Sequence, residues 1–157
     1  MTLPTYKYWY GVDPGARGAV ACVSHTGSFL VVRDLPTTNE EWLEWLQYPV
    51  KPKISYCTCE NVHALPGQST VAGFTFGKNV AKAELLAELL TTCESPLLVS
   101  PQKWKKFFGL DKDKHKSVEL ARELFPEASD YLLKSKDGRA EALLIAEYGR
   151  RTYKGEL

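Results

Sequence analysis

The chain has 157 residues, with 20 basic and 19 acidic side chains, 44% hydrophobic residues and four cysteines. This length fits one compact domain, and the composition is ordinary for a globular protein. No apolar run approaches the roughly 18 residues of a membrane-spanning helix, which excludes that class of protein. No secretory signal precedes the first strand-like run, so we expect a cytoplasmic protein that keeps its thiols reduced.

The near-neutral total hides local clusters of charge. Residues 103–116 carry six lysines against two aspartates, while acidic residues gather elsewhere, as at Glu40, Glu41 and Glu44. Local clusters rather than net charge govern attraction to a polyanion, so a nucleic-acid partner is not excluded. Cys57 and Cys59 lie two apart on one face of a strand-like segment. A zinc site needs more ligands at a recognisable spacing, and buried thiols explain these residues better.

Three strands are predicted at the start of the chain, over residues 6–12, 19–24 and 28–33. They are rich in aromatic and β-branched residues and are separated by short turns, which is typical of an antiparallel meander. The turn from Asp13 to Gly18 contains Pro14 and two glycines.

A helix is predicted next. Thr38 is suited to cap it, and Glu41, three residues later, completes a capping box. A fourth strand, residues 54–60, ends at Glu60. Residues 61–76 are small, polar and interrupted by glycines, so we expect a long loop, which in a compact domain is usually functional or mobile.

The rest of the chain alternates between helical and strand-like patterns. The predicted elements are a helix over 78–93, a strand over 96–100, and helices over 102–108, 113–124 and 137–152. Pro101 suits the first position of the helix over 102–108. The order of elements predicts an α/β fold with an antiparallel portion followed by crossover connections.

Four acidic residues stand at the ends of these elements. Asp13 closes the first strand, Glu60 closes the fourth, and Asp137 and Glu141 are four apart on one face of the last helix. If the two strands are neighbours, the helix can bring all four carboxylates together. Like charges at that range need cations, and oxygen-only ligands suit Mg²⁺ or Mn²⁺. Two such ions per site, about 3.5–4 Å apart, support phosphodiester hydrolysis.

Each acid also has a simpler interpretation. Asp13-Pro14-Gly15 alone is a common turn, a glutamate at a strand end is commonly solvated, and Asp137 can cap a helix. Glu141 is harder to dismiss because it borders the apolar stripe of its helix. The combination is therefore more specific than any one of its parts.

Several segments resemble the RuvC-type Holliday-junction resolvases, above all the small phage-encoded and related bacterial members. The segments run in the family's order over roughly residues 8–151: Gly11-Val12-Asp13-Pro14-Gly15, Cys59-Glu60, His63-Ala64-Leu65-Pro66-Gly67-Gln68-Ser69, Phe74-Thr75-Phe76-Gly77, Pro101-Gln102-Lys103-Trp104-Lys105 and Asp137-Gly138-Arg139-Ala140-Glu141-Ala142-Leu143-Leu144-Ile145-Ala146.

The resemblance implies an RNase H-like fold with a mixed five-stranded sheet, a homodimer, and Mg²⁺-dependent cutting of four-way DNA junctions without an organic cofactor. By position, Asp13, Glu60 and Glu141 match three of the family's four carboxylates, although many members have aspartate at the position of Glu141. The fourth acid commonly lies three residues before the last one, where this chain has Gly138. Asp137 lies four before, and we assign it as the fourth.

The basic segments supply candidates for DNA contacts. Their lysines can be a solvated face or can meet backbone phosphates, which would give salt-sensitive affinity without base specificity. Lys116 is also a candidate to assist the chemistry, and Phe74 or Phe76 can either enter the junction as a wedge or pack against the body. The residues expected to contact DNA are Gln68, Lys78, Lys103, Lys105, Lys106, Lys112, Lys116 and Arg139.

Three alternatives remain open. A nuclease of the same fold can act on RNA–DNA hybrids, flaps or other branched DNA, and a DNA-binding module can carry a degenerate site. An ATP-using protein of the actin and sugar-kinase type also has an Asp-x-Gly turn between early strands, but that architecture needs two such domains. For the dimer contact, Trp42, Trp45 and the helix over 78–93 are equal candidates.

Overall fold

The computed structural model describes residues 6–47, 54–62, 67–92 and 95–154. Its centre is a five-stranded sheet in the order β3-β2-β1-β4-β5. Strands β1 (Lys7–Asp13), β2 (Ala19–Ser24) and β3 (Phe29–Asp34) run antiparallel to one another, whereas β4 (Ile54–Glu60) pairs in parallel with β1 and with β5 (Leu97–Val99). The predicted α/β class, with a mixed sheet flanked by helices, is confirmed.

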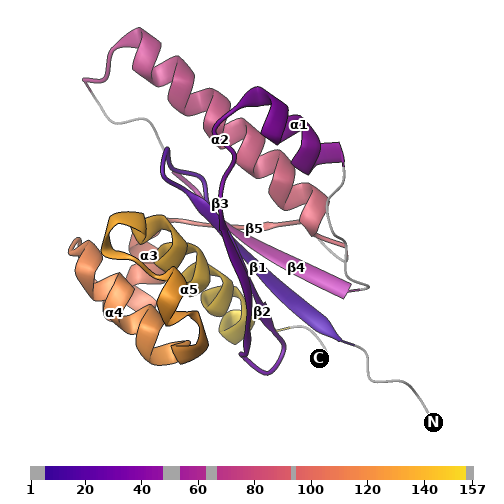
Figure 1. Ribbon diagram of the computed structural model, residues 1–157, viewed down its shortest axis with the longest axis vertical. Helices are drawn as coiled ribbons and strands as arrows, with labels where there is room; N and C mark the ends of the chain where they lie inside the picture. Colours follow the sequence, from indigo (N-terminus) through magenta and orange to yellow (C-terminus); the bar gives the residue numbers. More distant parts are fainter. Residues whose placement is uncertain (1–5, 48–53, 63–66, 93–94, 155–157) are drawn as a thin grey trace.

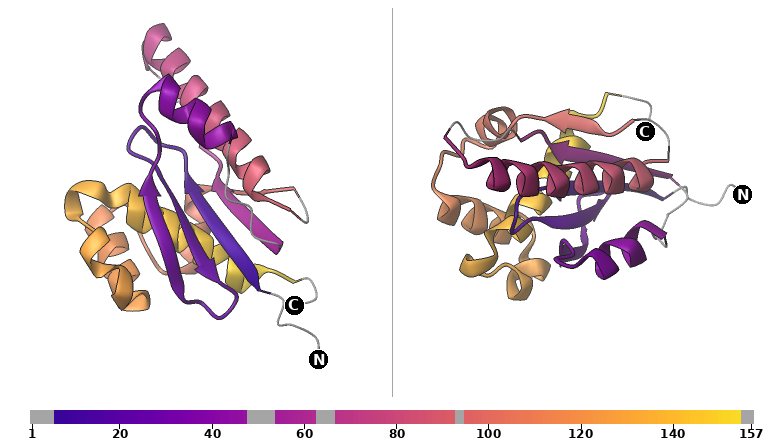
Figure 2. Two further views of the ribbon diagram at one scale, coloured as in Figure 1. Left: turned by 45° about the vertical axis from the view of Figure 1, so that its right-hand side comes forward. Right: turned by 90° about the horizontal axis from the view of Figure 1, so that it is seen from above.

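Helices cover both faces of this sheet (Figure 1). Helices α1 (Asn39–Gln47) and α2 (Thr70–Leu90) lie over one face. The other face carries α3 (Pro101–Phe107), α4 (Lys114–Leu124) and α5 (Asp137–Thr152), together with the short 3₁₀ helices η1 (Pro126–Tyr131) and η2 (Lys134–Lys136). The views in Figure 2 show α2 running along its face while its N-terminal half projects beyond the sheet.

The strand period of two sorts the side chains of β1 between two cores. Trp9 belongs to the core beneath α5, and Val12 to the core beneath α2. Gly11 lies on the α5 side, where a Cβ would stand 2.1 Å from the backbone oxygen of Ala142. A residue without a side chain is therefore required for α5 to lie directly on β1, which brings the first turn of α5 to the end of this strand.

One element differs from its prediction. The long loop expected over residues 61–76 is wrong from Thr70 onward, because α2 begins there, eight residues before the predicted start. Its N-cap is Ser69, whose Oγ accepts a hydrogen bond from the backbone N–H of Ala72 at 3.1 Å. Gly73 and Gly77 lower helix propensity and obscured the pattern, but the cap and the well-packed C-terminal half carry the helix through them.

The other boundaries agree with the sequence predictions to within about three residues. The cap of α1 differs slightly from an ideal capping box. The backbone N–H of Glu41 donates to Thr38 Oγ1 at 3.2 Å, but the Glu41 carboxylate accepts from the backbone N–H of Thr37, at 3.1 Å, rather than from that of Thr38.

The cysteines on the described strands are buried, free thiols, as expected. Cys57 and Cys59 lie in the core beneath α2, and burial raises the pKa of Cys59 to about 12, which makes its thiol unreactive. Cys93 lies outside the described residues. In the part of the chain that the structure describes, no helix is long and apolar enough to cross a membrane.

Candidate active site

Asp13 and Glu60 lie side by side at the carboxyl ends of two adjacent strands. Strands β1 and β4 are parallel, and their register pairs Val12 with Cys59, so the next residue of each strand is an acid. The condition set in the sequence analysis, that these two strands are neighbours, is therefore met. Both acids lie on the side of the sheet that faces α5, because they follow Gly11 and Thr58 by two residues on strands with a period of two.

The first turn of α5 supplies the other two acids. Asp137 is the first residue of the helix, and Glu141 stands one turn later on the same face. The four acidic residues are only 6% to 9% exposed. The backbone of Gly138 is close to Asp13, since a Cβ there would lie 3.3 Å from Asp13 Oδ2. All four predicted carboxylates thus gather around the junction of β1, β4 and α5.

Gly138 packs tightly against the turn that follows β1. A Cβ on residue 138 would lie 2.1 Å from the backbone oxygen of Arg17, in the turn that follows β1. Backbone atoms cannot yield to such a contact without a shift of the whole turn. A side chain three residues before Glu141 therefore does not fit here. Asp137, one residue earlier in the chain, supplies an acid to the site instead.

Helix α3 contributes a buried side chain that orients the carboxylate of Glu60. The indole Nε1–H of Trp104 donates a hydrogen bond to Glu60 Oε2 at 2.6 Å, and Trp104 is fully buried. Pro101 at the start of this helix and Ser100 as its cap fix the phase of α3, because Ser100 Oγ accepts from the backbone N–H of Lys103. This phase turns the indole toward the sheet.

Two lysines approach the acids from the solvent side. Lys114 Nζ lies 2.6 Å from Asp137 Oδ2, and Lys105 Nζ lies 3.5 Å from Glu141 Oε1. Helix α4 begins at Lys114 because Asp113 caps it, with Asp113 Oδ1 accepting from the backbone N–H of His115 at 2.9 Å. Two cations therefore face four carboxylates.

The pKa values of the acids reflect their burial and the charges of their neighbours. Burial, followed by the charges of Glu141 and Glu60, raises the pKa of Asp13 to about 8, although the backbone N–H of Gly15 and the ammonium of Lys114 act in the opposite direction. Burial likewise raises the pKa of Glu60, while the Trp104 indole opposes it. The hydrogen bond to Asp137 raises the pKa of Lys114. Raised pKa values mean that these carboxylates are unfavourable when they are ionised without a counter-charge. A bound cation relieves this cost.

The donor set suits a hard divalent cation. It consists of carboxylate oxygens only, which Mg²⁺ and Mn²⁺ prefer, and Glu141 Oε1 is buried without a hydrogen-bond partner. In their present rotamers, no three acidic, histidine or cysteine side chains among the described residues are arranged to hold one ion. Lys114 contacts Asp137 and Trp104 contacts Glu60, so these two carboxylates have partners on different elements. By its chemistry, this all-carboxylate donor set fits such an ion.

The residues predicted to contact DNA occupy different surroundings. Lys105 forms an ion pair with Glu141, one of the four acids. Arg139 donates two hydrogen bonds to Asp34, at 2.7 and 3.0 Å, and a third to the backbone oxygen of Tyr131, so its donors already tie α5 to β3. Lys116 pairs with Asp111. The remaining predicted DNA-binding residues are exposed, on α2 and its approach or around α3 and α4: Gln68, Lys78, Lys103, Lys106 and Lys112.

The sequence did not identify the roles of two residues at the site, Trp104 and Lys114. Trp104 is buried, and its hydrogen bond to Glu60 has no signal in the sequence. Lys116 was the candidate to assist the chemistry, whereas the structure brings Lys114 to the acids instead. Residues two apart on a helix point to opposite sides, and the start of α4 after the Asp113 cap directs Lys114 rather than Lys116 toward the acids.

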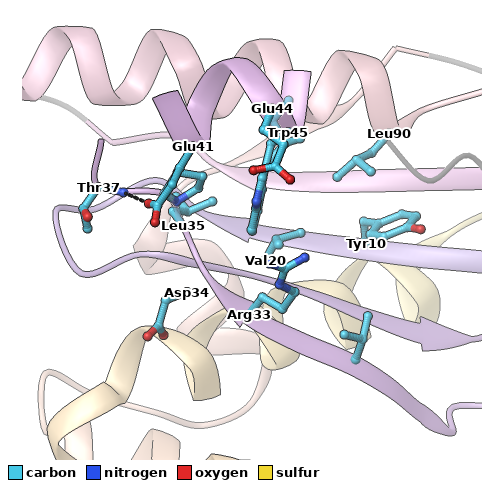
Figure 3. Close-up of a pocket in the computed structure, with 13 residues that line it drawn as sticks. Tyr10, Val20, Arg33, Asp34, Leu35, Thr37, Glu41, Glu44, Trp45 and Leu90 are labelled. Atoms are coloured by element: carbon cyan, nitrogen blue, oxygen red, sulfur yellow. Dashed lines mark hydrogen bonds between the residues drawn. The ribbon is translucent and has the colours of Figure 1, made fainter. Parts of the chain in front are cut away.

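A large hollow of the described structure lies elsewhere (Figure 3). It has a volume of about 850 Å³ and opens between α1 and the sheet face beneath α1 and α2. Arg33 stacks over the Trp45 ring at 4.6 Å on its wall, and the bond from Thr37 to Glu41 crosses its rim. None of the four clustered acids lines it.

Comparisons with known proteins add no family assignment. The chain matches no protein-family model, and no curated protein is significantly similar to it in sequence.

Proposed function

We propose that this protein is a metal-dependent, structure-selective DNA endonuclease that resolves four-way junctions as a homodimer. The observation that carries the proposal is the gathering of Asp13, Glu60, Asp137 and Glu141 in one buried cluster. Burying carboxylates against one another destabilises a fold, so an arrangement of this kind is typical of a site that needs cations.

The fold supports the same proposal. Three antiparallel strands followed by two parallel ones, with α5 lying on β1 beside the acids, are the arrangement that the resemblance to RuvC-type resolvases implies. We therefore assign the RNase H-like fold as part of the proposal.

Each residue has a defined task in the proposed reaction. Asp13, Glu60, Asp137 and Glu141 would hold Mg²⁺ or Mn²⁺, and two bound ions would activate water and offset charge on the scissile phosphate. Trp104 holds the Glu60 carboxylate in its orientation. Lys105 and Lys114 place positive charge beside the path of a phosphodiester, where it stabilises the extra negative charge of the transition state.

The surroundings of the site suit an extended, branched polyanion. Exposed lysines stand on both sides of the acidic cluster, Lys78 on α2 and Lys103, Lys106 and Lys112 around α3 and α4. Figure 1 shows α2 and the α3–α4 region on opposite sides of the sheet end that carries the acids. Backbone contacts of this kind recognise shape rather than base sequence.

The proposed dimer uses the projecting half of α2. Of the candidates for a dimer contact, Trp42 is buried and Trp45 is covered by Arg33. By contrast, Val71 is 75% and Phe74 70% exposed, beside a groove lined by Thr70, Gly73, Phe74, Gly77, Lys78 and Ala81. Two copies related by a two-fold axis would pair here and present two sites for paired cuts. Phe74 is then available to the partner or to the junction centre.

A second candidate function is the same chemistry on other branched DNA or on RNA–DNA hybrids. The acidic cluster serves all of these substrates equally. The choice of the four-way junction rests on the resemblance and on the proposed two-fold dimer.

The test incubates purified protein with a synthetic four-way junction, a flap, a duplex and an RNA–DNA hybrid. Each substrate is run with Mg²⁺, with Mn²⁺ and with chelator. We expect paired, symmetric nicks in the junction that depend on the metal. Cleavage confined to the flap or the hybrid would favour the second candidate, and binding without cleavage of any substrate would indicate a DNA-binding module.

A further inference from the structure

One side chain connects all four acids of the candidate site. Lys114 Nζ lies 2.6 Å from Asp137 Oδ2, and its charge also acts on Asp13, Glu60 and Glu141. Lys105, the other lysine at the site, is farther from its partner, at 3.5 Å from Glu141 Oε1. Lys114 therefore makes the shorter of the two lysine contacts with the cluster.

The placement of Lys114 allows its ammonium to leave. The Asp137 side chain is only 13% exposed, whereas that of Lys114 is 65% exposed, so the lysine reaches in from solvent with only its end engaged. Lys114 is the first residue of α4, and the cap on Asp113 holds the backbone independently of the lysine side chain. Rotation about side-chain bonds is enough to move the charge into solvent.

An ammonium and a divalent ion compete for the same oxygen atoms. The lone pairs of Asp137 that face Lys114 cannot ligate an ion while they accept the ammonium, and two cations at this range repel each other.

We propose that Lys114 is an internal counter-cation of the metal-free site, which a divalent ion must displace from Asp137. The proposal rests on the proposed function. The displaced ammonium then stands in solvent beside the site, where a backbone phosphate would bind it. Metal and DNA would consequently favour each other's binding, because both act on the position of one side chain.

Mn²⁺ binding without DNA tests the proposal. Free Mn²⁺ is measured by electron paramagnetic resonance at pH 8.5, to limit competition from protons, for the wild type, Lys114→Met and the matched variant Lys116→Met. Lys116 is on the same helix but pairs with Asp111. We expect Lys114→Met to bind Mn²⁺ about three- to tenfold more tightly, as for one charge removed from a partly exposed site, and Lys116→Met to stay near wild type.

Melting temperature gives a second readout that a merely structural lysine would not produce. In chelator, Lys114→Met is expected to melt below the wild type, since the acids lose their counter-cation. Saturating Mg²⁺ is expected to abolish or reverse this difference, whereas a packing defect would persist with the metal.

The outcomes separate the two proposals. If the wild type binds no Mn²⁺, the proposed metal-dependent function fails. If the wild type binds Mn²⁺ but Lys114→Met binds it equally or more weakly, the counter-cation proposal is overturned and the proposed function stands.

Discussion

The indole nitrogen of Trp104 donates a hydrogen bond to Glu60 Oε2 over 2.6 Å, linking α3 to the end of β4. The bond fixes one oxygen of a carboxylate that belongs to the proposed catalytic cluster. Groups that orient a metal ligand in this way commonly matter about as much as the ligand itself, with losses of about 10- to 100-fold in activity or metal affinity on mutation.

The substitution Trp104→Phe keeps an aromatic ring but removes the N–H donor. We expect junction cleavage to fall by about 10- to 100-fold, because Glu60 loses its orientation. The control is Trp42→Phe, a similar loss of buried aromatic volume in the core beneath α2. Single-turnover rates and melting temperatures of both variants are the measurement. Equal effects on rate in the two variants would mean that Trp104 serves packing alone.

The position of the fourth acid gives a second prediction. Asp137→Asn is expected to lower cleavage by at least roughly 100-fold, as for a ligand of a catalytic metal, while Asp130→Asn, at an exposed acid in η1, stays near wild type. The double variant Asp137→Gly with Gly138→Asp creates the spacing that is usual in the RuvC-type resolvases. It should nevertheless be inactive and less stable, because a side chain at 138 meets the backbone oxygen of Arg17. An active double variant would refute this explanation of the spacing.

The metal-free protein is expected to lose stability as pH rises. The folded pKa of Asp13, about 8, is above its ordinary value of 3.8, so the folded state retains a proton that the unfolded chain has released. The free energy of unfolding from this group therefore declines between about pH 4 and pH 8. Thermal melts in chelator across this range measure the decline, and about 1 kcal/mol corresponds to about 2–4 °C in a chain of this size.

Two controls identify the source of that pH dependence. Asp13→Asn should flatten the decline and melt above the wild type at pH 8 without metal. Added Mg²⁺ should raise the melting temperature of the wild type more than that of Asp13→Asn, because binding to the folded state stabilises it. A wild-type melting temperature that rises steadily over this pH range in chelator would contradict the raised pKa.

The exposed lysines of α3 are expected to act on DNA affinity rather than on chemistry. Replacing both Lys103 and Lys106 with alanine should weaken junction binding and reduce the slope of log K against log salt by about 0.9 for each phosphate that the protein no longer neutralises. Lys82→Ala is the control, since Lys82 donates a hydrogen bond to Asn39 of α1. Fluorescence anisotropy at several salt concentrations gives the slopes. Unchanged slopes would mean that these lysines form only a solvated face.

Much of the fold follows from local patterns in the sequence. Aromatic and β-branched residues between short turns predicted β1 and β2, a strand-like run predicted β4, and the apolar stripe of the last helix predicted α5 with the bounds that the structure gives. The start of α2 did not follow, because Gly73 and Gly77 have low helix propensity and the deciding cap is a single serine.

The candidate site was predictable in its acids but less so in its cations. A carboxylate at the end of a strand or in the first turn of a helix is fixed by backbone geometry, so Asp13, Glu60 and Glu141 could be assigned together. Long lysine side chains reach several directions, and the choice between Lys114 and Lys116 depends on helix phase. The bond of Trp104 depends on the packing of α3, which no local pattern encodes.

Asp13 is the centre of the proposed site, because it interacts with two of the other acids, with Lys114 and, through Gly138, with the start of α5. The most direct measurement compares wild type with Asp13→Asn on a four-way junction, using matched binding by anisotropy in Ca²⁺ and cleavage in Mg²⁺. We predict that Asp13→Asn binds the junction within about threefold of wild type and makes no detectable cut. Cleavage by Asp13→Asn at a rate close to wild type would contradict the central claim.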